Sequence, residues 1–162
     1  MAVSRSGSSR RREVLMWTLV LDAQCDLADA DFAWRFWTDV GNWPVVDPAI
    51  DHVRVEPAFE EGAQGTTVTS DGARVDWRIS EVVAFRRARI DFPVPGAALH
   101  VSWSFRPRPA GGCTMTQSME LSGERAAEYE PVVAPSMERS APGGLHRLAA
   151  AIDEAHARAA DA

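Results

Sequence analysis

The sequence has 162 residues, of which 46% are hydrophobic, and its formal net charge is −6. A chain of this length and apolar content suffices for one domain with a buried core, and its negative charge argues against binding to nucleic acid. No apolar run approaches the roughly 20 residues that span a membrane as a helix. Cys25 and Cys113 have neither the spacing of a metal site nor that of a disulfide framework, so we expect a cytoplasmic protein.

The N-terminal part divides into a tail and the start of the domain. Residues 1–12 are rich in Ser, Gly and Arg and are predicted to form a disordered basic tail, while residues 13–160 form the domain. The apolar run 14–21 follows three arginines and superficially resembles an export signal. Because the run is short and Gln24 does not suit a cleavage site before Cys25, we favour a first β-strand that is buried on both faces.

Aromatic residues gather in the segment 32–48, which contains three of the six tryptophans. Phe32, Phe36 and Val40 recur at a four-residue step, which predicts one apolar face of a short helix. Gly41 suits the end of this helix, because Gly adopts left-handed backbone angles without a steric penalty. A second short helical turn follows, and both need a broad apolar surface to pack against.

Six later segments alternate apolar and polar residues, as strands with one buried and one solvated face do. Turn sequences separate them, and Asp71-Gly72 is a strong signal for a tight hairpin. With the first strand they predict a seven-stranded antiparallel sheet whose apolar face must be covered. The six segments are residues 52–56, 66–69, 74–79, 87–92, 99–105 and 113–121.

The cover is predicted to be a C-terminal helix. From about Glu124 onward the chain is rich in Ala, Glu and Arg, which favour helix. Pro131 and Pro135 are expected to kink or break its early part, and residues 140–144 (Ser-Ala-Pro-Gly-Gly) to interrupt it. An apolar stripe then marks the face that covers the sheet, formed by Leu145, Leu148, Ala149 and Ile152, and Arg147, Asp153 and Glu154 are assigned to the opposite face.

Several segments of the sequence together carry a family resemblance. These are Phe36 to Pro48 with Asn42-Trp43-Pro44, the Glu61-Gly62 turn, Trp77-Arg78-Ile79-Ser80-Glu81, Gly112-Cys113-Thr114-Met115 and Pro142-Gly143-Gly144-Leu145. They resemble the START-like superfamily, also called SRPBCC, in its polyketide cyclase/dehydrase and lipid-transport type, over residues 13–158. Similar members are small bacterial proteins. The resemblance implies an α+β helix-grip fold: a seven-stranded curved antiparallel sheet wrapped around a long C-terminal helix, with two short helices between strands 1 and 2.

The helix-grip fold implies a cavity between the sheet and the C-terminal helix. The inward strand positions would line it with aromatic rings and methionines, which suit flat rings and irregular apolar shapes. The ligand implied is a small hydrophobic molecule, aromatic or polyketide-like. The expected lining residues are Trp43, Trp77, Ile79, Ile90, Phe92, Val101, Trp103, Phe105, Met115, Gln117, Met119, Met137 and His146.

Gln117 is the clearly polar residue on an otherwise apolar strand face. An unsatisfied amide in an apolar cavity is unfavourable by about 1–3 kcal/mol. A ligand carbonyl or hydroxyl would satisfy it, and a backbone group or a buried water would do so equally well. The sequence leaves both alternatives open.

Three residues near the expected cavity have two interpretations each. His146 is either a proton donor at the cavity or, as we favour, a histidine on the helix surface. Asp47 either lies at the pocket mouth or, as we favour, caps a turn. Trp43 either covers the cavity or, as we favour, packs in the corner of the two short helices.

Charged residues on the strands are assigned to the outer face of the sheet. Arg74 and Arg78 share a strand face with Asp76, which favours a charged outer surface, because the opposite orientation would expose Trp77. His100 lies on the polar face of its strand and is expected to be solvated.

Two functional hypotheses follow, and the first is favoured. The protein is either a carrier or sensor of a hydrophobic molecule, or a cyclase, aromatase or dehydratase that acts on a polyketide in the same cavity. No catalytic signature, cofactor motif or metal-ligand spacing is present in the sequence. A role in protein interaction is a weaker third hypothesis, and the protein is expected to be a monomer or a homodimer.

Overall fold

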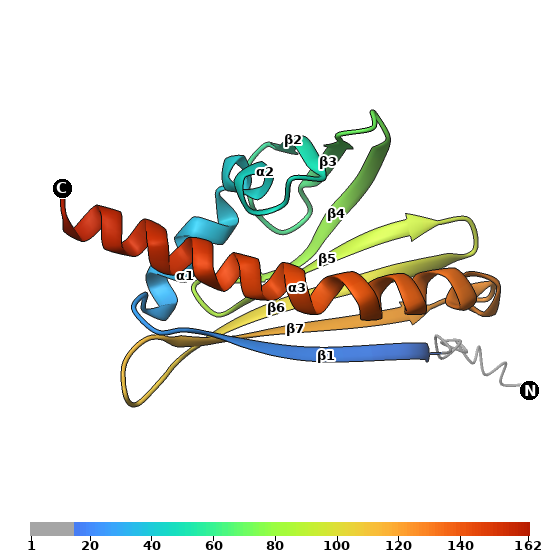
Figure 1. Ribbon diagram of the computed structural model, residues 1–162. Coiled ribbons are helices and arrows are strands. Elements are labelled where there is room, and N and C mark those ends of the chain that lie inside the picture. Colours follow the sequence, from blue (N-terminus) through green and yellow to red (C-terminus); the bar gives the residue numbers. More distant parts are fainter. Residues whose placement is uncertain (1–14) are drawn as a thin grey trace, which may run out of the picture.

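A computed structural model describes residues 15–162, so the predicted tail at residues 1–12 lies outside the described residues. Within residues 15–162 the chain forms one seven-stranded antiparallel sheet in the order β1-β7-β6-β5-β4-β3-β2. The long helix α3 crosses one face of this sheet, and β2 to β4 bend upward beside it (Figure 1). This arrangement confirms the predicted α+β helix-grip fold.

The elements in order are β1 (Leu15–Cys25), α1 (Ala30–Thr38), the 3-10 turn η1 (Val40–Asn42), α2 (Trp43–Val46), β2 (Ile50–Glu56), β3 (Gln64–Thr69), β4 (Arg74–Val83), β5 (Arg87–Val94), β6 (Ala97–Pro107), β7 (Cys113–Ser122) and α3 (Ala126–Ala160).

The strands alternate as the sequence predicts. In β4, Trp77 and Ile79 are buried, while Arg74, Asp76 and Arg78 are exposed. The arginines therefore lie on the outer face of the sheet, as expected, and the nitrogen Nε of Arg74 contacts the Asp76 carboxylate at 3.1 Å. Alternation of this kind fixes the register, because a shift by one residue would expose every apolar side chain of the strand.

The first strand is present, but the prediction that it is buried on both faces is wrong. Ala23 and Cys25 face the core, whereas Val20 is 63% exposed on the opposite face. The reason is that α3 covers only one face of the sheet, and no other described element covers the other. The strand continues through Cys25, which lies directly opposite Cys113 of β7, and both thiols are buried and free.

The buried face of α1 differs from the predicted one. Its buried residues are Ala30, Ala33, Trp34 and Trp37, whereas Phe32 and Phe36 are only partly buried. Trp34 and Trp37 reach the strands, and Phe32 instead packs edge-on against His156 of α3 at 5.0 Å between ring centroids. A helix of nine residues that is aromatic on two neighbouring faces does not reveal by its periodicity which face meets the sheet.

The predicted interruption of the C-terminal helix is also wrong. α3 runs without a break for 35 residues through Pro131, Pro135 and Pro142, and through Gly143 and Gly144. These residues weaken the helix locally, but its stability comes mainly from tertiary packing. The buried stripe extends along the helix on both sides of the predicted break and consists of Ala126, Ala134, Ala141, Leu145, Leu148, Ala149 and Ile152.

One carboxylate ties α3 to the connection between β1 and α1. Oδ2 of Asp153 accepts a hydrogen bond from the backbone nitrogen of Asp26 at 2.7 Å. Its Oδ1 accepts from the backbone nitrogens of Leu27 at 3.0 Å and Ala28 at 2.9 Å. Successive N–H groups that converge on one anion form a strong local contact. This contact holds α3 at a fixed position over the sheet.

We predict that Asp153→Ala lowers the free energy of unfolding by about 2–3 kcal/mol, because it leaves three backbone donors without their charged acceptor. Urea unfolding measures the loss. Glu154→Ala is the matched control: Glu154 forms an exposed pair with Arg158 at 3.2 Å, so its removal should change stability by only about 0.3–0.5 kcal/mol. Equal effects of the two substitutions would contradict the role of Asp153.

Candidate functional site

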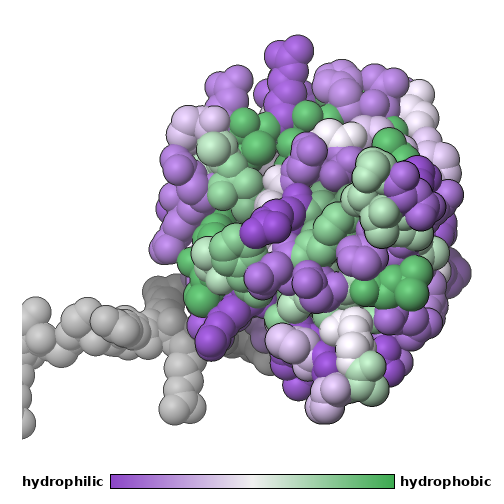
Figure 2. All heavy atoms as spheres, turned by 90° about the vertical axis from the view of Figure 1, so that its left-hand side faces the viewer, coloured by the Kyte–Doolittle hydropathy of each residue, from purple (hydrophilic) through white to green (hydrophobic). Residues whose placement is uncertain are grey.

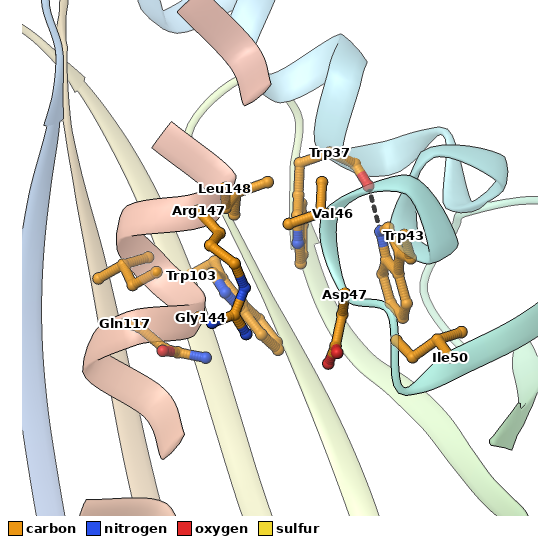
Figure 3. A pocket seen from close by; sticks show the side chains of 11 residues that line it. Trp37, Trp43, Val46, Asp47, Ile50, Trp103, Gln117, Gly144, Arg147 and Leu148 are labelled. Carbon is orange, nitrogen blue, oxygen red and sulfur yellow. Dashed lines mark hydrogen bonds between the residues drawn. The ribbon is translucent and has the colours of Figure 1, made fainter. Parts of the chain in front are cut away.

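Two chambers lie between the sheet and α3. The first, which we call the α2 chamber, has a volume of about 180 Å³ and lies between α3, α2 and strands β6 and β7 (Figure 3). A volume of this size is comparable to a cavity that holds a benzene ring. Its lining residues are Trp37, Trp43, Val46, Asp47, Ile50, Trp103, Gln117, Gly144, Leu145, Arg147 and Leu148.

The second chamber lies under the first half of α3, and we call it the apolar chamber. Its volume is about 410 Å³, and strands β4 to β7 form its floor. Together the chambers fall in the range of about 300–1,000 Å³ that is usual for small-molecule sites. The lining residues are Val75, Phe92, Val94, Leu99, Val101, Trp103, Gln117, Met119, Leu121, Tyr129, Val133 and Met137.

Trp103 and Gln117 line both chambers and therefore lie at their boundary. The Oε1 atom of Gln117 is buried and has no hydrogen-bond partner among the described residues. In Figure 3 the Gln117 amide extends from the sheet into the space below α3. Buried polar atoms in native proteins are almost always paired. The amide oxygen at this position can accept a hydrogen bond from a ligand hydroxyl or from a buried water.

Trp37 and Trp43 form the wall of the α2 chamber opposite α3, and Trp77 extends their stack away from the chamber. Trp43 lies between Trp37 and Trp77, with ring centroids 6.1 and 5.4 Å away. Its Nε1 donates to the Trp37 carbonyl oxygen at 2.7 Å (Figure 3). Trp43 thus packs in the corner, as favoured, and also borders the chamber. Because the indole N–H is already paired, the ring offers a ligand only its apolar face.

Trp77 fits only because residue 65 is Gly. The indole Nε1 of Trp77 donates to Thr67 Oγ1 at 2.9 Å, which holds the ring over β3. A Cβ atom at position 65 would lie 2.2 Å from the Trp77 ring. Trp77 borders neither chamber; it borders a polar groove of about 560 Å³ formed by β2, β3 and β4.

Two charged residues face the α2 chamber. Asp47 lines it and also caps a turn, since its Oδ1 accepts from the backbone nitrogen of Ala49 at 3.0 Å. Arg147 is exposed on α3, as the sequence predicts, and also lines the chamber, which its place opposite the apolar stripe does not reveal. Its guanidinium lies beside Gly143 and Gly144, whose missing side chains leave room for it. Neither Asp47 nor Arg147 forms an ion pair with a described residue.

The structure brings some of the predicted site residues together and separates others. Besides Trp43 at the α2 chamber, six of them border the apolar chamber: Phe92, Val101, Trp103, Gln117, Met119 and Met137. Four others, Ile79, Ile90, Phe105 and Met115, are buried in the close-packed core and border neither chamber.

His146 does not face a chamber and is exposed on α3. In a continuous helix, each residue is turned about 100° from the one before it. Leu145 and Leu148 point to the sheet, so His146 and Arg147 both leave the helix toward solvent, and of the two only Arg147 also lines a chamber. His146 is therefore a histidine on the helix surface, as favoured, and it does not belong to the cavity lining in which it was expected.

The expectation that His100 is solvated is wrong. His100 is 8% exposed, its Nδ1 contacts Asp91 Oδ1 at 2.6 Å, and its Nε2 contacts Ser122 Oγ at 2.9 Å. Burial raises the pKa of the Asp91 carboxyl, but hydrogen bonds from His100 and Arg89 outweigh it and leave the pKa below its usual value. The chain of contacts joins β5, β6 and β7 on the face opposite α3, because the neighbouring Leu99 and Val101 line the apolar chamber.

The remaining surfaces offer fewer indications of function. In the described part of the chain, no helix is both long and apolar enough to cross a membrane. No group of three or more His, Cys, Asp or Glu among residues 15–162 is arranged to hold a metal ion. At the end of the molecule where α3 finishes, apolar side chains are interspersed with polar ones (Figure 2).

The family is shown by sequence. A family model described as polyketide cyclase/dehydrase and lipid transport matches residues 16–153. The chain belongs to this family. This match confirms the family resemblance seen in the sequence. No curated protein is significantly similar to it in sequence.

Solved structures of low sequence identity share the fold of this family member. Norcoclaurine synthase from Thalictrum flavum, as a point mutant with a transition-state analogue, has a TM-score of 0.68 at 14% identity. The match covers 91% of this chain and 98% of the synthase chain. A protein from Mesorhizobium loti has a TM-score of 0.66 at 17% identity, with 85% and 98% covered. The di-domain ARO/CYC protein StfQ of the steffimycin biosynthetic pathway has a TM-score of 0.62 at 17% identity; 86% of this chain matches 52% of StfQ. At these identities the likeness concerns the fold alone.

We predict that Gln117→Leu raises the free energy of unfolding of the ligand-free protein by about 1–3 kcal/mol, because it removes a buried acceptor that has no partner. Urea unfolding measures the gain. Gln64→Leu, at an exposed position of β3, is the control and should change stability by less than about 0.5 kcal/mol. A loss of stability in Gln117→Leu would instead indicate that a water molecule satisfies the amide.

Proposed function

We propose that this protein binds a hydrophobic small molecule that has an aromatic or polyketide-like part, in the two chambers between the sheet and α3. The observation that carries the proposal is the unpaired Gln117 amide oxygen at the boundary of the two chambers. Small-molecule sites combine an apolar lining with a few polar groups that orient the ligand. A ligand hydroxyl would satisfy the oxygen, and after rotation of the amide a ligand carbonyl would accept from its NH₂ group.

The glycines of α3 support the same proposal. Each Gly in a helix interior is less favourable than Ala by about 1 kcal/mol. Gly144 lines the α2 chamber beside Leu145, Arg147 and Leu148, and its missing side chain leaves space between them. A binding role explains this loss of helix stability, because larger residues at position 144 would reduce the space for a ligand.

The alternative function is a cyclase, aromatase or dehydratase that acts on a polyketide in the same chambers. The description of the family and the similarity to StfQ favour it, as does the presence of Asp47, Arg147 and Gln117 in one chamber. In that case Asp47 would remove a proton, and Arg147 and Gln117 would stabilise the enolate. We rank binding first, because Asp47 and Arg147 lie at the polar end of the site and no histidine borders either chamber among the described residues.

The domain limits 13–160, a cytoplasmic location, and a monomeric or homodimeric state stay predictions.

We predict that the freshly purified protein carries extra mass under native conditions, and that this mass disappears on denaturation. Mass spectrometry of the same sample under both conditions makes the measurement, and fragmentation of the released molecule gives its class. A protein of bare mass under native conditions would contradict stable binding and favour the enzyme, whose substrate occupies the chambers only transiently.

We also predict that Gly144→Leu removes the bound molecule without destabilising the protein. A Cβ atom at position 144 meets only the flexible end of Arg147, at 3.8 Å, and Leu has the higher helix propensity. The control is Ala150→Leu, because Ala150 is exposed on α3 and lines neither chamber. Thermal unfolding should show both variants folded with a stability close to that of the wild type, while native mass shows ligand only in Ala150→Leu. Full ligand occupancy in Gly144→Leu would contradict binding in the α2 chamber.

A further inference from the structure

The two chambers differ sharply in polarity, and this difference points to the shape of the ligand. We infer that the ligand is an elongated carboxylate whose head group is bound by Arg147 in the α2 chamber. Its apolar chain extends past Trp103 and Gln117 into the apolar chamber. This inference rests on the proposed function and adds the ligand's class and orientation to it.

The apolar chamber has no charged lining residue among those described. Its polar members are Gln117 at the boundary and Tyr129, whose hydroxyl already donates to the Pro95 carbonyl oxygen at 2.8 Å. Val133 and Met137 of α3 close the chamber from above. A polar head group placed here would lose its hydration without gaining a partner, so this chamber suits the apolar end of a ligand.

The α2 chamber, by contrast, has one cationic group with free donors. Arg147 lines this chamber from an exposed position of α3 and forms no ion pair with a described residue, and Gly144 beside its guanidinium has no side chain that would narrow the chamber. A guanidinium matches a carboxylate in geometry and binds it through two parallel hydrogen bonds. Gln117 of β7 lines the same chamber from the side of the sheet. Both can donate to the same head group.

Asp47 is the charged group that faces Arg147 across this chamber. It makes an amine the competing choice for the head group. We favour the carboxylate because Asp47 Oδ1 already accepts a hydrogen bond from Ala49 at 3.0 Å, whereas the donors of Arg147 are uncommitted among the described residues. Asp47 then weakens carboxylate binding by repulsion, so its neutralisation should strengthen that binding.

The head-group test compares dodecanoate, 1-dodecanol and dodecylamine by isothermal titration calorimetry, below their aggregation concentrations. We expect dodecanoate to bind most tightly. Arg147→Gln should weaken dodecanoate about fivefold and leave 1-dodecanol unchanged, and Asp47→Asn should strengthen dodecanoate. Arg139→Gln, an exposed arginine elsewhere on α3, is the control and should change neither. Equal affinities for dodecanoate and the alcohol, or tighter binding of the amine, would overturn the assignment of the head group.

The chain-length test uses two neighbouring valines of α3. Val133 lines the apolar chamber, whereas Val132 is 73% exposed. Val133→Phe should weaken dodecanoate at least fivefold and leave hexanoate unchanged, because only the longer chain reaches the apolar chamber. Val132→Phe should affect neither, and thermal unfolding checks that both variants are folded. Unchanged binding of dodecanoate to a folded Val133→Phe variant would overturn the proposed orientation.

A neutral aromatic probe, 2-naphthol, separates this inference from the proposed function. Suppose that 2-naphthol binds the wild type but not Gly144→Leu, and that the carboxylates do not bind at all. In that case the inference of an elongated carboxylate ligand is wrong, and the proposed function stands. If neither 2-naphthol nor any of the long-chain probes binds, the proposed function fails as well.

Discussion

Three successive backbone N–H groups, those of Asp26, Leu27 and Ala28, converge on the Asp153 carboxylate. This contact joins the connection between β1 and α1 to the second half of α3, while the curved sheet supports the helix along its length. Strands cannot make such a contact in their middle, because their backbone groups are already paired in the ladder. The separation of helix and sheet is thereby set at one end. The chambers exist because the side chains between the two layers do not fill that separation completely.

Much of the fold is predictable from the sequence, because alternation in the strands depends on a simple constraint. A sheet that is covered on one face needs apolar residues at every second position, and Trp77 and Ile79 of β4 show it clearly. The same alternation identifies the inward residues but not which of them border a void. Ile90 and Phe92 face the same way on β5, yet the first is fully buried in the core and the second lines the apolar chamber. That difference depends on how far α3 lies from each strand position.

The failures of prediction share another cause: contacts between residues distant in sequence outweigh local preferences. Pro142 and the two glycines after it predict a helix end, but the buried face of α3 holds the helix together through them. Arg147 is exposed on α3, as its position opposite the apolar stripe predicts, but that pattern does not show that the residue also lines the α2 chamber. His100 follows a polar pattern on its strand, and only the pairing of β5, β6 and β7 brings Asp91 and Ser122 to it. No local sequence signal identifies partners on other strands.

The aromatic corner gives the protein an optical property. Trp37, Trp43 and Trp103 border the α2 chamber, Trp34 packs on Trp37 and Trp77 stacks on Trp43, so five of the six tryptophans form one connected cluster. Their ring centroids are 4.9 to 6.1 Å apart along the series Trp103, Trp37, Trp43 and Trp77. Indoles at such separations exchange excitation energy readily. The ultraviolet emission of this protein is therefore dominated by one cluster, and it reports on the occupancy and polarity of a single site without any added label.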